Sequence, residues 1–335
     1  MNNHGLMTLS IAWGILSATL ACAQCSHIQL SDGWSFRQVG AEEWYSADVP
    51  GVVHTDLLRH GLIPDPYVDF NADSVQWIEN KDWEYTRIIT ADPALLKNEH
   101  IDLVFHGLDT FSEIYLNDSL LGEADNMFRT WEWPIEERLH LGANELKVVF
   151  RSPITEGKKL RDAYGIQLPH DNDPSGVSPY IRKAAYQFGW DFAPRLVSCG
   201  IWQPVELRCW NGSYITSVQV LQRFDADRIR ATIHANVRRD VRASIHYFLD
   251  DRPIGERRVG PSRSDSIDSP IQFAVDKKDL WWPAGSGKQP LHRIRVEVHN
   301  AKGRMLDRVQ CRRSEERRVG TACRSRWSPA PSPPP

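Results

Sequence analysis

A stretch near the middle of the chain, QFGWDFAPRLVSCGIWQP (residues 187–204), concentrates aromatic and charged side chains between glycines and prolines. Within it, Trp190, Asp191 and Phe192 place a carboxylate between two aromatic rings. Sugars carry hydroxyl groups around the ring and C–H groups on its faces, so a sugar site combines an aromatic wall with a carboxylate that accepts hydrogen bonds. The pattern indicates a substrate-binding site at Trp190, Asp191 and Phe192, with a sugar as the ligand.

The same residues also have a purely structural interpretation. Trp190 and Phe192 could face the core of a sheet, since large aromatic side chains are commonly buried, and Asp191 could cap a turn or pair with Arg195. On composition alone this structural interpretation has the greater weight, so the choice depends on the rest of the chain.

The elements that must hold this stretch are predicted to be β-strands. Residues 27–212 form one β-rich domain, because runs of alternating apolar and polar residues are separated by turn residues. A short helix, VVHTDLLRHG, is expected to end at Gly61. No rhythm of strand, long helix and strand is present, which argues against a parallel α/β sheet. The predicted strands are IDLVFHGLD (101–109), SEIYLNDSLLG (112–122, turning at Asn117-Asp118) and the alternation of Leu146, Val148 and Phe150 after a turn at 142–144.

Residues 213–311 are predicted to form a second, smaller all-β domain. Several short strands within about 100 residues are typical of an immunoglobulin-like sandwich. The alternating runs extend from Ile229 to Val237, from Ala243 to Leu249 and from Ile294 to Val298.

The two ends of the chain differ from these domains. Residues 1–23 resemble a signal peptide, because Leu6 to Ala21 is apolar and uncharged and Ala21-Cys22-Ala23 has signal-peptidase spacing. The run is short for a membrane span, so we expect export to the periplasm or the outside of the cell. Lipidation of Cys22 is an alternative anchor. From Arg312 to Pro335 the chain has no apolar periodicity, which predicts a disordered tail. The tail resembles a translated sequencing adapter more than a basic nucleic-acid-binding arm.

Charge and cysteine content exclude several functions. The 335-residue chain has a formal net charge of -3, so nothing in its balance suggests nucleic acid or an anionic membrane as a partner. Cys199 and Cys209 could pair in an oxidising compartment, which spacing alone does not decide. No histidine cluster at ligand spacing supports a metal site.

Four segments in order carry a resemblance to a known family. They are VPGVVHTDLLRHGLIPDPY (49–67), LVFHGLDTFSEIYLNDSLLGEADNMFRTWEWP (103–134), YIRKAAYQFGWDFAPRLVSCGIWQPVEL (180–207) and LWWPAGSGKQPL (280–291). Together they make residues 30–310 similar to the front of the β-mannosidases of glycoside hydrolase family 2. The resemblance implies an all-β fold here: a jelly-roll, galactose-binding-like β-sandwich followed by an immunoglobulin-like β-sandwich. It also implies that the family's catalytic (β/α)₈ barrel is absent from this sequence.

The resemblance assigns a role to the central stretch. In the family, the matching segment reaches from the first domain into the mouth of the barrel and holds the terminal mannose. This implies that Trp190, Asp191 and Phe192 bind the substrate, although family members often have tryptophan where Phe192 stands. The resemblance implies no cofactor.

Retaining hydrolysis needs two carboxylates about 5–5.5 Å apart. The family's two glutamates lie in the barrel, one of them after an asparagine. Asn98-Glu99 and Asn144-Glu145 do not qualify, because the first is expected in a polar loop and the second in a hairpin turn of the first domain. No catalytic residue is therefore expected within the chain.

The sequence thus predicts the N-terminal part of a β-mannosidase that acts on terminal, non-reducing β-D-mannose with retention. Its partners would be a β-mannoside oligosaccharide and the barrel in cis. A stand-alone carbohydrate-binding protein is the alternative, and an adhesion protein built of paired β-sandwiches is a third.

Overall fold

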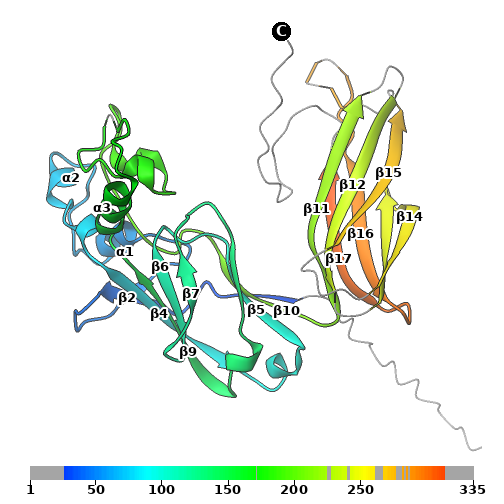
Figure 1. The fold of residues 1–335 in the computed structure, drawn as a ribbon, viewed down its shortest axis with the longest axis horizontal. Helices are drawn as coiled ribbons and strands as arrows, with labels where there is room; N and C mark the ends of the chain where they lie inside the picture. Colours follow the sequence, from blue (N-terminus) through cyan, green and yellow to red (C-terminus); the bar gives the residue numbers. More distant parts are fainter. Residues whose placement is uncertain are drawn as a thin grey trace, which may run out of the picture.

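The computed structural model describes residues 26–170, 172–224, 228–239, 242–260, 267–276, 281–282, 284–285 and 287–313. The predicted signal peptide, Cys22 and the chain beyond Arg313 lie outside these residues. The described residues form two β-rich domains, which join where β10 (Val205–Trp210) leads into β11 (Ser213–Phe224) (Figure 1).

The first domain contains two antiparallel sheets. A six-stranded sheet has the order β3-β2-β4-β9-β6-β7, and a four-stranded sheet has the order β1-β10-β5-β8. The bounds of the larger sheet are β2 (Trp34–Gln38), β3 (Tyr45–Ala47), β4 (Trp83–Ala91), β6 (Ser112–Leu116), β7 (Ser119–Ala124) and β9 (Gly142–Phe150). The smaller sheet adds β1 (Ser26–Gln29), β5 (His100–Phe105) and β8 (Trp131–Pro134) to β10.

Both sheets contribute to one apolar core. Phe36, Tyr85 and Phe150 from the larger sheet and Phe105 from the smaller sheet are each 0% exposed and belong to one cluster. Successive strand side chains point to opposite faces, so the alternation that predicted these strands also fills this core. The predicted β-sandwich is confirmed.

The second domain repeats this plan with fewer strands. A three-stranded sheet, β11-β12-β15, shares a core with a four-stranded sheet, β14-β13-β16-β17. The predicted immunoglobulin-like sandwich is confirmed. The remaining bounds are β12 (Arg228–Arg239), β13 (Ala243–Leu249), β14 (Arg252–Val259), β15 (Ile267–Asp276), β16 (His292–Asn300) and β17 (Met305–Arg313).

The last strand, β17, includes the first two residues of the predicted tail. Arg312 pairs with Arg293 and Arg313 with His292 in the β16–β17 ladder. Arg313 also donates from Nη2 to the carbonyl of Val220, at 3.0 Å. Both arginines are therefore strand residues, because backbone pairing needs no apolar side chain at these positions.

Short helices cover one end of the first domain (Figure 1). The predicted helix is confirmed as α1 (Val53–Arg59), and Gly61 follows it with φ +67°. The longest helix, α3, was not predicted. The other helical turns are α2 (Asn71–Ser74), η1 (Ile78–Asn80), η2 (Leu95–Lys97), η3 (Glu136–Arg138), η4 (Ser178–Tyr180) and η5 (Ala185–Phe188).

The helix α3 (Pro153–Tyr164) begins and ends at clear signals. The Ser152 hydroxyl accepts the N–H of Thr155 at 3.1 Å, and Gly165 closes the helix in the left-handed conformation, with φ +72°. The sequence signal was weak because only Pro153, Ile154 and Gly157 of the helix are buried, which is too few for an apolar stripe.

The turn between β6 and β7 is confirmed at Asn117 and Asp118, which have φ of +49° and +61°. The predicted hairpin turn at Asn144-Glu145 is wrong, because both residues lie inside β9. Asn144 is 0% exposed, and its side-chain amide bonds Asn117 at 2.9 Å and the His140 carbonyl at 2.8 Å. A polar residue fits this buried strand position because its side chain supplies hydrogen-bond partners to polar groups of the neighbouring turns.

Cys199 and Cys209 are separate buried free thiols, so they do not form a disulfide in this structure. Burial raises the pKa of both thiols, that of Cys209 to about 11. Among the helices of the described part, none is long and apolar enough to cross a membrane.

Candidate functional site

The three predicted site residues lie on an exposed turn. Trp190 and Ala193 exchange backbone hydrogen bonds of 3.1 and 3.2 Å, and Gly189 leads into the turn with φ +95°. Trp190 is 53% exposed and Phe192 86% exposed, and Asp191 is also exposed. Neither ring therefore faces a sheet core, so the structural interpretation of these aromatics is wrong.

Asp191 does not pair with Arg195. The guanidinium of Arg195 instead bonds Glu79 at 2.8 Å and lies 5.5 Å from the centre of the Phe188 ring. Asp191 forms no side-chain hydrogen bond or ion pair with any residue that the structure describes. The turn thus presents a free carboxylate between two exposed rings.

The segments just before and after the turn, residues 187–189 and 194–196, form a stem that is held by backbone and side-chain hydrogen bonds. Leu196 donates its N–H to the carbonyl of Gln187 at 2.9 Å. Gln76, which follows α2, donates from Nε2 to the carbonyl of Arg195 at 2.7 Å. These bonds join the two segments to each other and to the region after α2.

A buried ion pair lies beneath this stem. Lys183 Nζ is 2.5 Å from Asp109 Oδ1, and Gln187 Nε2 donates to Asp109 Oδ2 at 2.8 Å. Gln187 also accepts the N–H of Ser198 at 3.0 Å, and Lys183 donates to the Ser198 carbonyl at 2.6 Å. Lys183, Gln187 and Ser198 therefore join the segments before and after the turn to Asp109. Sequence reasoning missed this cluster, because these residues have no common motif.

Two titratable groups beside the stem have shifted pKa values. Burial, with a contribution from the positive charge of Lys183, lowers the pKa of His54 to about 4. His54 Nδ1 lies 2.9 Å from the Ser198 hydroxyl. Burial raises the pKa of Glu79 to about 7, although the charge of Arg195 opposes that shift. At neutral pH His54 is uncharged.

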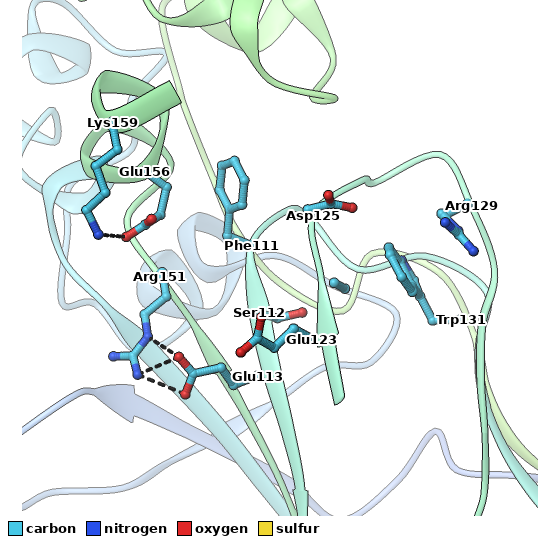
Figure 2. A pocket seen from close by; sticks show the side chains of 11 residues that line it. Phe111, Ser112, Glu113, Glu123, Asp125, Arg129, Trp131, Arg151, Glu156 and Lys159 are labelled. Atoms are coloured by element: carbon cyan, nitrogen blue, oxygen red, sulfur yellow. Dashed lines mark hydrogen bonds and ion pairs between the residues drawn. The ribbon is translucent and has the colours of Figure 1, made fainter. Parts of the chain in front are cut away.

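A separate groove of about 590 Å³ lies beside α3 and the upper ends of β6 and β7 (Figure 2). Carboxylates and cations from β6, β7, α3 and the residues that follow β7 and β9 project into it, and Phe111 and Trp131 give it two aromatic groups. Five of its lining residues come from the segment GEADNMFRTWEWP (122–134), which has no motif that predicts a site. The lining residues are Phe111, Ser112, Glu113, Glu123, Ala124, Asp125, Arg129, Trp131, Arg151, Glu156 and Lys159.

The two glutamates that follow asparagines are engaged in structural contacts. Glu99 accepts the N–H of Gly212 at 2.8 Å, and Glu145 accepts the Thr86 hydroxyl at 3.0 Å. Within the described residues, no group of three or more His, Cys, Asp and Glu side chains has the arrangement of a metal site.

Comparisons with known proteins cover both domains. The family described as "Glycosyl hydrolase 2 galactose-binding domain-like" matches residues 34–203, and "Glycosyl hydrolases family 2" matches residues 213–313. Beta-mannosidase B of Thermothelomyces thermophilus is 32% identical over 283 residues, which cover 81% of this chain and 32% of that protein. The chain spans about a third of the length of the curated relatives it matches.

Solved structures of glycoside hydrolases are also similar to this chain. The β-D-mannosidase of Dictyoglomus thermophilum has a TM-score of 0.79 and 34% identity, covering 86% of this chain and 36% of that chain. An exo-chitosanase of Amycolatopsis orientalis has a TM-score of 0.65 at 18% identity, covering 87% of this chain and 33% of that chain, which shows a shared fold alone. The chain therefore belongs to glycoside hydrolase family 2, and it resembles the N-terminal portion of the family's β-mannosidases.

Proposed function

We propose that this chain is part of a β-mannosidase that removes terminal, non-reducing β-D-mannose from oligosaccharides with retention. The observation that carries the proposal is the gap in identity between the solved structures. The chain is 34% identical to a β-D-mannosidase but 18% identical to an exo-chitosanase of the same fold, over similar shares of its length.

In this proposal the exposed turn contributes to the site of the terminal mannose. Asp191 accepts hydrogen bonds from sugar hydroxyls, and Trp190 and Phe192 contact the C–H face of the ring. The exposure of all three residues and the absence of a described partner for Asp191 support this role. The hydrogen-bonded stem would keep the turn in place while the sugar binds.

The two catalytic carboxylates are proposed to come from another segment of the enzyme. A retaining reaction needs a nucleophile and an acid/base about 5–5.5 Å apart. One carboxylate attacks the anomeric carbon while the other protonates the leaving oxygen, and water then releases mannose from the covalent intermediate. The turn carries one carboxylate, Asp191, so it can orient the sugar but cannot supply this pair.

The test uses the chain alone and a chimera. In the chimera, residues 26–313 replace the matching portion of the Dictyoglomus thermophilum β-D-mannosidase. We expect no product from an aryl β-mannoside with the chain alone, and release of mannose with the chimera. An aryl β-glucosaminide serves as the comparison substrate.

Two results would contradict the proposal. One is reproducible hydrolysis by the chain alone that disappears when one of its own carboxylates is substituted. The other is a folded chimera that hydrolyses the β-glucosaminide faster than the β-mannoside.

A further inference from the structure

We propose that the groove beside α3 is a second saccharide-binding site, which works independently of the Trp190 turn and takes a neutral, β-linked sugar chain. Its volume of about 590 Å³ falls within the range of about 300–1,000 Å³ that is usual for small-molecule sites. The choice of a mannoside as the ligand rests on the proposed function, whereas the site itself rests on the groove alone.

Some charged groups of the groove are already paired. Arg151 donates two hydrogen bonds of 2.9 Å to the Glu113 carboxylate, and Lys159 donates one of 2.7 Å to Glu156 (Figure 2). These pairs hold the wall formed by β6, β9 and α3 in one arrangement. They also remove four of the charges from competition for a ligand.

The remaining polar groups lack partners. Glu123 and Asp125 are exposed, and neither side chain forms a hydrogen bond or ion pair with a described residue. Ser112 also lines the groove and is only 3% exposed, and its buried hydroxyl has no hydrogen-bond partner. A buried hydroxyl without a partner is unusual in a folded protein, so a water molecule or a small movement of the groove wall is needed to complete it.

The two aromatic groups lie on opposite sides of the groove. Phe111 stands between α3 and β6, and Trp131 lies across the groove from it (Figure 2). The guanidinium of Arg129 is 4.2 Å from the centre of the Trp131 ring, which places a hydrogen-bond donor at the rim. Apolar ring surface, two free carboxylates and a cation together match the C–H groups and hydroxyls of a sugar.

The charge of the groove disfavours an anionic ligand. The lining contains four carboxylates and three cations, and two pairs of these neutralise each other. Glu123, Asp125 and Arg129 remain, so an anionic ligand would meet a net negative charge. The hydroxyl groups of a neutral polyol can donate to the two carboxylates and accept from the guanidinium.

The groove differs from another cavity of the chain, of about 540 Å³, where the two domains meet. There the polar groups are used by the fold: Asp307 accepts the N–H of Ile215 at 2.9 Å, and Arg208 bonds Glu132 at 3.0 Å. That cavity offers a ligand fewer free groups than the groove beside α3.

The experiment titrates the 335-residue chain with β-1,4-mannotriose by isothermal calorimetry. We expect a dissociation constant on the order of 1 mM, which is typical of a shallow site with few contacts. The double variant Glu123→Gln/Asp125→Asn should weaken binding at least about tenfold, because it replaces two charge-assisted acceptors. Since both side chains are exposed and unpartnered, this variant should fold like the parent chain.

Matched controls separate the groove from the rest of the surface. Trp131→Ala should weaken binding, whereas Trp44→Ala should not, although Arg37 covers Trp44 at the same 4.2 Å. The inference fails if mannotriose does not bind, if Glu123→Gln/Asp125→Asn binds it as tightly as the parent, or if only Trp190→Ala abolishes binding.

This outcome is distinguishable from a failure of the proposed function. If the chimera hydrolyses β-mannosides but the chain does not bind mannotriose, the saccharide site in the groove is rejected and the proposed β-mannosidase function stands. If the chain binds mannotriose through the groove but the folded chimera does not hydrolyse β-mannosides, the saccharide site stands and the β-mannosidase function is rejected.

Discussion

The ammonium group of Lys183 lies 2.5 Å from Asp109 Oδ1, and the two side chains are 0% and 1% exposed. Lys183 comes just before the exposed turn, and Asp109 follows β5 some seventy residues earlier. The Thr110 hydroxyl and Gln187 also donate to the Asp109 carboxylate. Because each charge is out of water, each depends on the other for compensation.

Lys183→Met should destabilise the first domain by about 3–5 kcal/mol, because it leaves the Asp109 carboxylate buried and unpaired. Urea denaturation followed by tryptophan fluorescence measures this loss. Lys159→Met is the matched control, since the Lys159–Glu156 pair is exposed and should contribute less than about 1 kcal/mol. Equal losses in the free energy of unfolding for the two substitutions would show that the buried pair stabilises the fold no more than the exposed pair does.

Gln187→Met should loosen the turn while leaving the sheets intact. It removes the bonds to Asp109 Oδ2 and to the Ser198 N–H, so the amides of Trp190 and Ala193 should exchange about tenfold faster. Hydrogen exchange with mass spectrometry measures the peptides that contain the turn. Gln219→Met, at an exposed strand position, should change nothing there. Unaltered protection in Gln187→Met would mean that the side chain does not position the turn.

Acidification should weaken the fold through His54. The pKa of His54 is lowered from 6.5 to about 4 by burial and by Lys183, so its contribution to stability is present above about pH 6.5 and is lost as the pH falls toward 4. Between pH 7 and pH 5 the loss should be about 2 kcal/mol. Denaturation curves at the two pH values measure it, and His54→Gln should lack this component. If His54→Gln loses as much stability between pH 7 and pH 5 as the parent chain, protonation of His54 is not the cause of the loss.

Asp191→Asn should affect kinetics and not stability. In the active chimera, we expect kcat/KM for an aryl β-mannoside to fall about ten- to a hundredfold, because an amide replaces a charge-assisted acceptor of sugar hydroxyls. The melting temperature should stay unchanged, since Asp191 is exposed and has no described partner. A lowered melting temperature with unchanged kinetics would instead restore a structural role for Asp191.

The strands could be predicted because their signal is local. Leu146, Val148 and Phe150 alternate along β9 and fill the core, and Asn117-Asp118 tolerate the positive φ that a tight hairpin requires. The helix α3 escaped prediction because its apolar face is too small, although Ser152 and Gly165 mark its ends.

The candidate site was predictable only in part, because only residues that are close in the sequence form a visible pattern before the chain is folded. Trp190 and Asp191 are adjacent in the sequence, so their combination of ring and carboxylate is visible there. Asp109 and Lys183 meet only because β5 and the stem of the turn fold together. Likewise, the unpartnered hydroxyl of Ser112 becomes evident only once every neighbouring donor and acceptor has been placed.

The pairing of β1 with β10 has a consequence for the engineering of this domain. Ser26 lies opposite Cys209, so the polypeptide enters and leaves the first sandwich at neighbouring points. The sandwich can therefore be grafted into a surface loop of another protein without long linkers. Its original ends can also be joined, and new ends opened at the Asn117-Asp118 turn. Such a circular permutant keeps every strand neighbour while changing the order in which the strands are synthesised.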